Sequence, residues 1–389
     1  MPPSPARPRP WLVVYSVNGL SRTLLPDGKT RQGQALQPRP QDPRYTIVND
    51  LVTRALAVFD SEHGRDTLVQ VADDIIKARE DATNPQGFPA PEPHIYRPET
   101  GSMRNWVGFF LSRLRGCFPE IDIKRIGKPT AVTNKKSWGL DMAAYNPHNA
   151  AVIELNGAII ENMLRMRGTQ HQRTNGTSAY EILEFEMTVS VAHEIVHLLT
   201  GFLTGANRPN TPYSLAPTGY AETMPDGETR GEIGWYWENL YLGGILEFWT
   251  NPTDPLGNNQ AGTPYLFEEQ ELPDENTLDE DGFPAEPEDP IGFPVTSASI
   301  RAFLGYNFSP LMLDERDEAT VDREYLVSKG RMLTGLLRVP ATGPGSSSAA
   351  GAAARARART DIRQRRVRYV ALRRRLQPTR ARGSAARRR

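Results

Sequence analysis

The sequence predicts an α+β fold that is predominantly helical, with a small sheet, loop-rich flanks and disordered termini. One observation is a helical pattern, in which apolar residues recur at three- and four-residue steps from Ile182 to Leu199. A second is the short apolar run 150–155, typical of a buried strand. The third is composition. The 389 residues include 33 Pro and 32 Gly and are 38% hydrophobic, so we expect extensive loops.

The N-terminal third predicts helices separated by loops. Residues 1–10 are Pro-rich and expected to be disordered, and 26–44 and 84–101 are expected to be loops. Two helices are predicted between 45 and 80, with Asn49-Asp50 as a cap and a break at His63-Gly64. A further helix over 103–114 and a strand over 122–126 follow.

The middle third has the most regular pattern. The strand over 150–155 ends at Asn156-Gly157, and a helix over 158–166 and a polar loop over 168–177 follow. Ser178 and Glu181 then form an S-x-x-E capping box, in which each side chain satisfies a free backbone N–H of the first helical turn. This box begins the helix through Leu199, which is expected to end near Gly201.

The C-terminal third is less regular. The apolar stretch 231–249 predicts a buried helix interrupted at Gly243-Gly244, with its three tryptophans in the core, and 321–337 predicts a last helix. Residues 341–360 form a low-complexity linker. We therefore expect one folded domain over 11–340, with its functional core at about 150–250, and a disordered Arg-rich tail over 341–389.

A formal net charge of zero conceals a strong asymmetry. Residues 345–389 contain 15 Arg and one Asp, whereas 267–290 contain eleven acidic residues, four prolines and no Lys or Arg. The acidic run is expected to be a surface loop. The tail predicts contact with nucleic acid, a nuclear-localisation patch or docking to an acidic protein; the alternative is a solvated disordered tail. The tail could also fold back onto the acidic loop, an attraction that salt would weaken.

Three features bear on the compartment. Cys117 is the only cysteine, so no intrachain disulfide is possible; we expect a small buried hydrophobe in a reducing compartment. No run approaches the roughly 18 apolar residues of a membrane span. The only N-terminal apolar run is 11–14, shorter than the about 7–15 residues of a signal-peptide core. We therefore expect an intracellular protein, cytoplasmic or nuclear.

The capped helix contains His193, Glu194 and His197 in the order H-E-I-V-H. Residues at i and i+4 lie on one helical face, about 5–6 Å apart at Cβ, so both imidazoles can reach one Zn²⁺ at about 2.0–2.1 Å. Glu194 points elsewhere and can reach the metal-bound water, whose pKa zinc lowers towards about 7. The alternative, two surface histidines, fits poorly because the helix is apolar around most of its circumference.

A third ligand must be sought outside the motif. No histidine follows His197, and Leu203 occupies the position of the third histidine in a metzincin motif, so a downstream ligand has to be a carboxylate. Glu232 is the leading candidate because Gly231 and Gly234 permit close backbone approach to the motif helix. The alternatives, which stay open at this point, are Glu238, Glu228 and His171.

HEIVH on a capped helix, with a later carboxylate in place of histidine, resembles the gluzincin class of zinc-dependent metallopeptidases. The strand over 150–155 and the helix after it resemble the minimal zincin-like scaffold, in which a strand edges the cleft; the resemblance covers about 150–245. It implies His193, His197 and Glu232 as zinc ligands and Glu194 as the acid/base. It also implies an extended peptide or protein substrate paired with that strand.

The resemblance leaves some points open. SprT-like proteases share HExxH but use a downstream histidine, which this sequence lacks. Tyr220, Tyr236 and Tyr241 are possible oxyanion stabilisers without further support. Two other functions stay possible: a non-catalytic, zincin-derived protein-interaction domain, and a nucleic-acid-associated protein acting through its basic tail. Glu194 argues against the first, since a purely structural zinc site has no use for a general base.

Overall fold

The computed structural model describes part of the chain, and all of that part belongs to the compact unit Met1–Leu337. The described residues are 17–24, 30–36, 42–82, 89–124, 126, 130–167, 173–174, 177–205, 211–215, 217, 222–223, 229–250, 261–268, 291–314, 321–329 and 331–334. The predictions for 1–10, for 341–389 and for nearly all of the acidic run fall outside them.

The described residues form an α+β structure, in agreement with the predicted class. Its helices are α1 (Pro43–Val58), α2 (Glu62–Glu80), α3 (Met103–Gly116), α4 (Pro147–Ala150), α5 (Gly157–Arg167), α6 (Ala179–Thr204), α7 (Ile233–Leu242), α8 (Ser297–Leu304) and α9 (Arg323–Ser328). Its strands are β1 (Val17–Leu24), β2 (Thr30–Leu36), β3 (Glu120–Lys124), β4 (Ala131–Lys135), β5 (Ala151–Asn156), β6 (Arg173–Thr174), β7 (Thr177–Ser178), β8 (Glu222–Thr223), β9 (Thr229–Arg230), β10 (Ile245–Thr250), β11 (Thr263–Phe267), β12 (Ile291–Pro294), β13 (Val321–Asp322) and β14 (Met332–Thr334).

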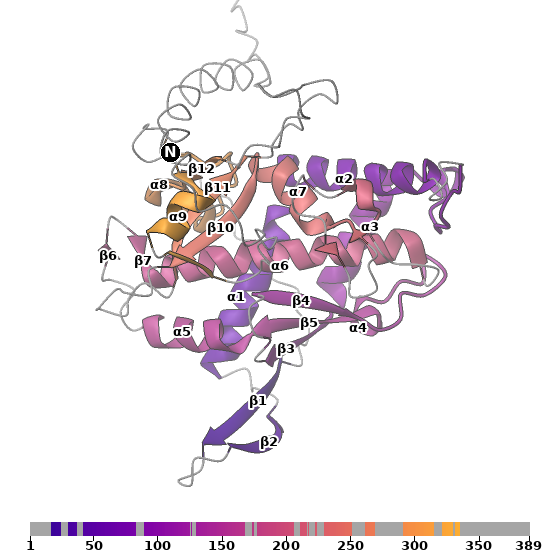
Figure 1. Cartoon of the computed structure of the whole chain (residues 1–389). Helices are drawn as coiled ribbons and strands as arrows, with labels where there is room; N and C mark the ends of the chain where they lie inside the picture. Colours follow the sequence, from indigo (N-terminus) through magenta and orange to yellow (C-terminus); the bar gives the residue numbers. More distant parts are fainter. Residues whose placement is uncertain are drawn as a thin grey trace, which may run out of the picture. The chain divides into compact units, whose positions relative to one another are not determined.

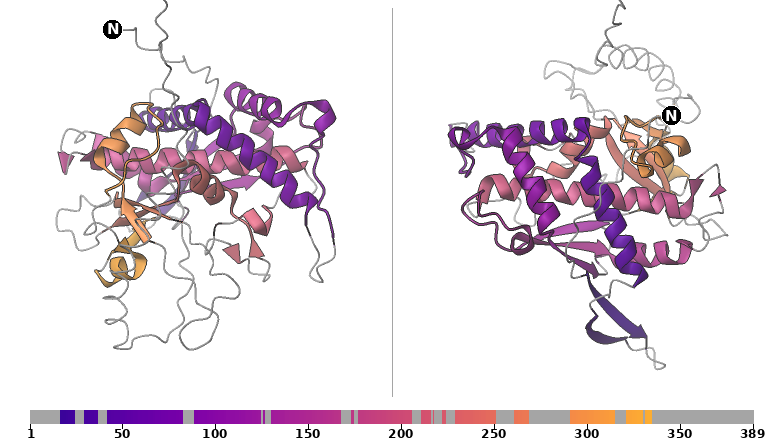
Figure 2. Two further views of the ribbon diagram at one scale, coloured as in Figure 1. Left: turned by 90° about the horizontal axis from the view of Figure 1, so that it is seen from above. Right: turned by 180° about the vertical axis from the view of Figure 1, so that it is seen from behind.

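Helix α6 is the central element of this unit. It contacts α1, α5, α7, α8 and β4, and it runs between the first sheet and α7 (Figure 1). The view from behind in Figure 2 shows α1 crossing it. The predicted capping box is confirmed, because Ser178 accepts from the Glu181 N–H while Glu181 accepts from the Ser178 N–H. By length and composition α6 could cross a membrane, but 94% of its most apolar window is buried within the fold, which explains that composition.

The end of α6 differs from the prediction. The helix continues through Gly201 to Thr204, and Gly205 follows with a positive φ of +65°, which favours glycine. Gly201 is needed inside the helix because the Trp138 ring lies against it; a Cβ there would approach a ring carbon to 1.7 Å. Close packing between two distant segments, and not helix termination, therefore explains Gly201.

The first sheet has the strand order β2-β1-β3-β5-β4. Strands β1, β3 and β5 run parallel, whereas β4 pairs antiparallel with β5 and lies at the edge. The predicted strand over 150–155 corresponds to β5, which is interior because it pairs on both sides. The edge strand that contacts α6 is β4, which the sequence analysis does not predict.

The second sheet has the order β13-β12-β11-β10-β14. The single helix predicted over 231–249 is half wrong: α7 ends at Gly243 in a left-handed conformation, and β10 follows as a strand between β11 and β14. The last helix predicted over 321–337 is also largely wrong, since α9 is flanked by β13 and β14. Both errors arise because pairing partners distant in sequence select the strand conformation.

Four further predictions need correction. The loop expected over 26–44 contains β2, which pairs with β1. His63-Gly64 lies inside α2 and not between helices; Ser61 caps α2, and Asp42, not Asn49-Asp50, caps α1. Cys117 is half-buried, with its Sγ 3.5 Å from Asn146 Oδ1.

Candidate metal centre

The two motif histidines lie side by side on the face of α6 that meets α7. Their ring centroids are 5.2 Å apart, as the i, i+4 spacing predicts. His193 is only 1% exposed, whereas the His197 side chain retains 21% exposure. The pair is therefore closed on the His193 side and reachable from solvent on the His197 side.

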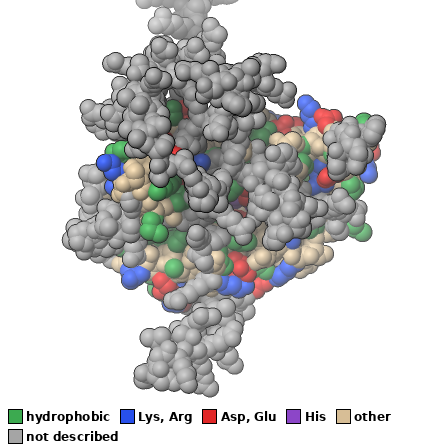
Figure 3. All heavy atoms as spheres, viewed as in Figure 1, with side chains coloured by type: hydrophobic (Ala, Val, Ile, Leu, Met, Phe, Trp, Pro, Cys, Tyr) green, Lys and Arg blue, Asp and Glu red, His purple; other side chains and the backbone are tan. Residues whose placement is uncertain are grey.

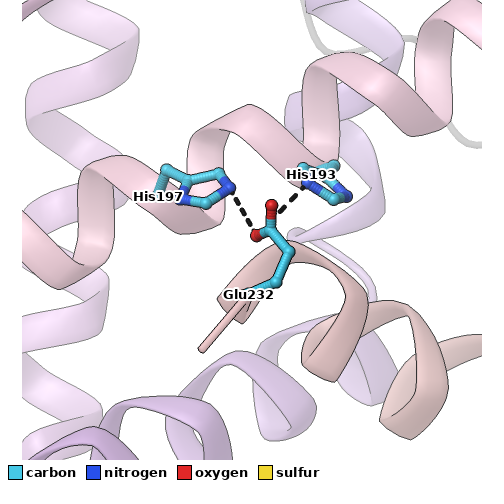
Figure 4. Close-up of side chains that lie close together, drawn as sticks. All are labelled: His193, His197 and Glu232. Atoms are coloured by element: carbon cyan, nitrogen blue, oxygen red, sulfur yellow. Dashed lines mark ion pairs between the residues drawn. The ribbon is translucent and has the colours of Figure 1, made fainter. Parts of the chain in front are cut away.

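Glu232 meets both rings from the start of α7. Its Oε1 lies 2.7 Å from His197 Nε2 and 3.6 Å from His193 Nε2, and Figure 4 shows the carboxylate between the two rings. The same oxygen accepts from the Gly234 N–H at 3.1 Å, so Glu232 is also the N-cap of α7. One side chain thus couples the start of α7 to both histidines.

Gly234 permits this approach between α6 and α7. A Cβ at Gly234 would lie 2.2 Å from His193 Nε2, a separation that no real side chain tolerates. Gly231 serves a different purpose, because a Cβ there would lie 1.9 Å from the Pro212 carbonyl oxygen. The predicted role in close helix approach is therefore confirmed for Gly234 only.

Glu238, an alternative ligand in the sequence analysis, binds the opposite side of His193. Its Oε1 is 2.8 Å from His193 Nδ1, and its Oε2 accepts from the Leu246 N–H at 3.2 Å. The carboxylate is buried. Glu238 therefore orients the ring and leaves Nε2 facing Glu232. The other two alternatives, Glu228 and His171, lie outside the described residues.

Neighbouring charges determine the protonation of His193 and Glu232. Burial disfavours the charged form of His193, but Glu232 and Glu238 outweigh it and raise the pKa of the imidazole well above its ordinary value. Burial likewise opposes ionisation of Glu232, yet His197 and His193 lower the pKa of that carboxyl well below its ordinary value. With two carboxylates around it, the centre is suited to hold positive charge.

The three side chains fit a metal ion. One imidazole nitrogen of each histidine and one Glu232 oxygen lie within 4.8 Å of one another. Ligand atoms around tetrahedral zinc are about 3.3 Å apart when the bonds are about 2.0–2.1 Å. Small side-chain adjustments would therefore bring all three atoms to ligand distance. Of the predicted metal ligands, His193, His197 and Glu232 are thus brought together as a group that could bind a metal ion.

The edge strand β4 contacts the turn of α6 that bears Glu194. Glu194 is buried at 4% exposure, and its backbone carbonyl accepts from Thr133 Oγ1 of β4 at 3.4 Å. The turn that bears the predicted base is thereby held against β4. The sequence does not predict β4, because residues 131–135 have no clear apolar alternation.

The tyrosines considered for oxyanion stabilisation have other partners. Tyr236 donates to Asp74 Oδ2 at 2.9 Å, and the Tyr241 ring stacks on Trp237 and His63. Tyr220 lies outside the described residues. As expected, Trp235, Trp237 and Trp249 are all buried, with the Trp235 ring edge-on to His193 at 6.0 Å between centroids.

Comparisons of this chain with protein-family models, with curated proteins and with solved structures find no match. The side chains and their geometry are therefore the basis for assigning a function.

Proposed function

We propose that this chain is a zinc-dependent peptidase of the gluzincin type, with a zincin-like core. The observation that supports it is that His193 and His197 of α6 meet Glu232 from the start of α7, and that α6 also carries Glu194 between the two histidines. Two imidazoles and one carboxylate form one of the protein ligand sets of catalytic zinc, which keeps a further position open for water or substrate.

Zinc is one of the metals that suit this ligand set, and it is the one we propose. Imidazole nitrogen suits zinc, copper, iron and nickel, whereas magnesium and calcium prefer oxygen-only sites. The outer carboxylate Glu238 supports this choice, because a histidine that binds zinc commonly donates its second ring N–H to a carboxylate. That hydrogen bond assigns the proton of a neutral His193 to Nδ1 and leaves the Nε2 lone pair for the metal.

Each residue then has a separate task. Bound zinc would supply Lewis acidity and lower the pKa of its water ligand towards about 7. Glu194 accepts the proton of the attacking water and returns it to the leaving amine. Among the described strands, β4 is paired on one side only, and its other edge offers main-chain groups to an extended peptide beside the Glu194 turn.

The two alternative functions receive less support. A non-catalytic zinc domain gives no reason for the buried Glu194 beside the metal group. Nucleic-acid binding depends on the Arg-rich tail, which lies outside the described residues. On the face shown in Figure 3, the described acidic and basic side chains are interspersed, without the single-sign patch that a phosphate backbone would favour.

Elemental analysis combined with peptide-library digestion tests the proposal. We expect about one zinc per wild-type chain, none after His193→Ala, and weakened binding after Glu232→Gln. Glu194→Gln should retain zinc but lose at least about 100-fold in peptide hydrolysis. Full zinc affinity in Glu232→Gln would contradict the ligand assignment, and wild-type hydrolysis by Glu194→Gln would contradict the mechanism.

A further inference from the structure

A line of polar side chains follows the metal face of helix α6, whose sequence is largely apolar. Glu186, Ser190, His193 and His197 recur at steps of four, three and four residues, so they share one helical face. We call these four residues the polar stripe. The metal group takes up its C-terminal half, and Glu186 forms its N-terminal end, two helical turns before His193.

Among the described residues, Glu186 has no partner for its carboxyl group. The residue is 2% exposed, and neither side-chain oxygen has a hydrogen bond, whereas buried carboxyl groups are normally paired. Burial alone raises the pKa of this carboxyl well above its ordinary value of 4.5, without any contribution from a neighbouring charge. An unpaired buried carboxyl destabilises a fold, so its presence in the central helix calls for a role outside folding.

Ser190 connects the stripe to the edge-strand side of α6. Its hydroxyl lies 2.9 Å from the Glu186 carbonyl oxygen and 2.9 Å from Thr130 Oγ1, and Thr130 directly precedes β4. Thr133, further along β4, meets α6 at Glu194. The edge strand therefore follows α6 from the Ser190 turn to the Glu194 turn, with Glu186 one turn before this stretch.

We propose that Glu186 is a specificity residue that selects substrates with a cationic side chain, arginine or lysine, close to the scissile bond. This inference rests on the proposed peptidase function. Glu186 and His193 are seven positions apart, which corresponds to roughly 10 Å along the helix, a distance suited to a long side chain but too great for the reacting backbone itself.

A guanidinium group would satisfy Glu186 completely. Its planar fork donates to both carboxylate oxygens at once, and a charge-assisted pair is strongest where water is excluded. The carboxyl group is shielded from solvent in this structure, so a bound cation has to displace side chains that cover it. The ion pair with Glu186 offsets the free-energy cost of that displacement. A neutral side chain forms no such pair and leaves the cost uncompensated.

Hydrolysis of paired peptides provides the first test. Peptides that differ only by arginine or norleucine beside the cleaved bond are compared on full-length, zinc-loaded protein. We expect Glu186→Gln to lower kcat/KM for the arginine peptide about 30-fold or more while leaving the norleucine peptide within about threefold. The matched control is Glu181→Gln on the same helix, because glutamine at this position preserves the capping box.

Binding of n-butylguanidine, measured by calorimetry on the same proteins, provides a readout that needs no catalysis. We expect weak binding to wild type and Glu181→Gln, and loss of binding in Glu186→Gln. Peptide cleavage without a basic preference, together with no Glu186-dependent binding, would overturn the inference and leave the peptidase function standing. Glu186-dependent binding without any cleavage would overturn the peptidase function, and the specificity role with it, and would leave only a carboxyl group that binds cations; absence of both would overturn both proposals entirely.

Discussion

His193 Nδ1 and Glu238 Oε1 lie 2.8 Å apart in the buried interface between α6 and α7. The second oxygen of Glu238 accepts from the Leu246 N–H, so the carboxylate ties the imidazole to the start of β10. Because one ring nitrogen is engaged in this way, the other is held towards Glu232 and His197. The orientation of this candidate metal ligand thus depends on a strand of the second sheet.

Replacing Glu238 should weaken metal binding without removing a ligand. Glu238→Gln keeps the size of the side chain but weakens its hydrogen bond to His193, so we expect zinc affinity to fall about 10- to 100-fold. Competition with a chromophoric chelator measures this. Glu161→Gln, at a half-exposed carboxylate on α5, is the control and should leave zinc affinity unchanged. Wild-type affinity in Glu238→Gln would show that the contact has no orienting role.

Gly234→Ala should damage the centre by a steric route. The added Cβ would lie 2.2 Å from His193 Nε2, so either the ring turns away or α7 retreats from α6. We expect at least about tenfold weaker zinc binding and a loss of about 1–3 kcal/mol in the free energy of unfolding. Gly108→Ala in α3 is the matched control: no described atom outside its own helix backbone lies within 4 Å of the position that the new Cβ would take, and it should stabilise by about 0.5–1 kcal/mol.

Gly201→Ala separates helix propensity from packing by the sign of its effect. Propensity alone predicts stabilisation by about 1 kcal/mol, because alanine replaces glycine inside a helix. The structure predicts the opposite, since the new Cβ would overlap the Trp138 ring and cost about 1–3 kcal/mol. Chemical denaturation measures the difference, and a more stable Gly201→Ala protein would refute the packing of Trp138 against α6.

Glu186 should make stability depend on pH in a defined direction. Its pKa is raised in the folded state, so above its ordinary value of 4.5 the unfolded chain releases a proton that the folded chain retains. Stability therefore falls as pH rises, by up to about 1.4 kcal/mol per pH unit, until the folded-state carboxyl itself ionises. The stability gained by Glu186→Gln relative to wild type should therefore grow as the pH rises above about 5, where the unfolded carboxyl is ionised and the folded one stays protonated. Denaturant unfolding of both chelator-treated proteins across this pH range measures the difference in their free energies of unfolding. A difference that does not change with pH would argue against a buried, unpaired carboxyl.

Tertiary packing decided which acidic side chain joins the histidines. Glu232 and Glu238 are six residues apart in one acidic and aromatic stretch; the neighbouring glycines favour Glu232, but local sequence does not fix which carboxylate meets both histidines. The contact of Gly234 with His193 sets the position of α7 so that Glu232 faces the two Nε2 atoms and Glu238 faces Nδ1. The choice depends on where two helices cross, and the motif contains no information about that crossing.

The sequence by itself determined the features that depend on near neighbours. The capping box at Ser178 and the shared face of His193 and His197 follow from helical geometry over a few residues, and the lack of any later histidine limits a downstream third ligand to a carboxylate. Tertiary structure alone decided that β4 forms the sheet edge and that residues 245–250 form a strand. Strand pairing joins segments far apart in the chain, and its energy is absent from any local window of sequence.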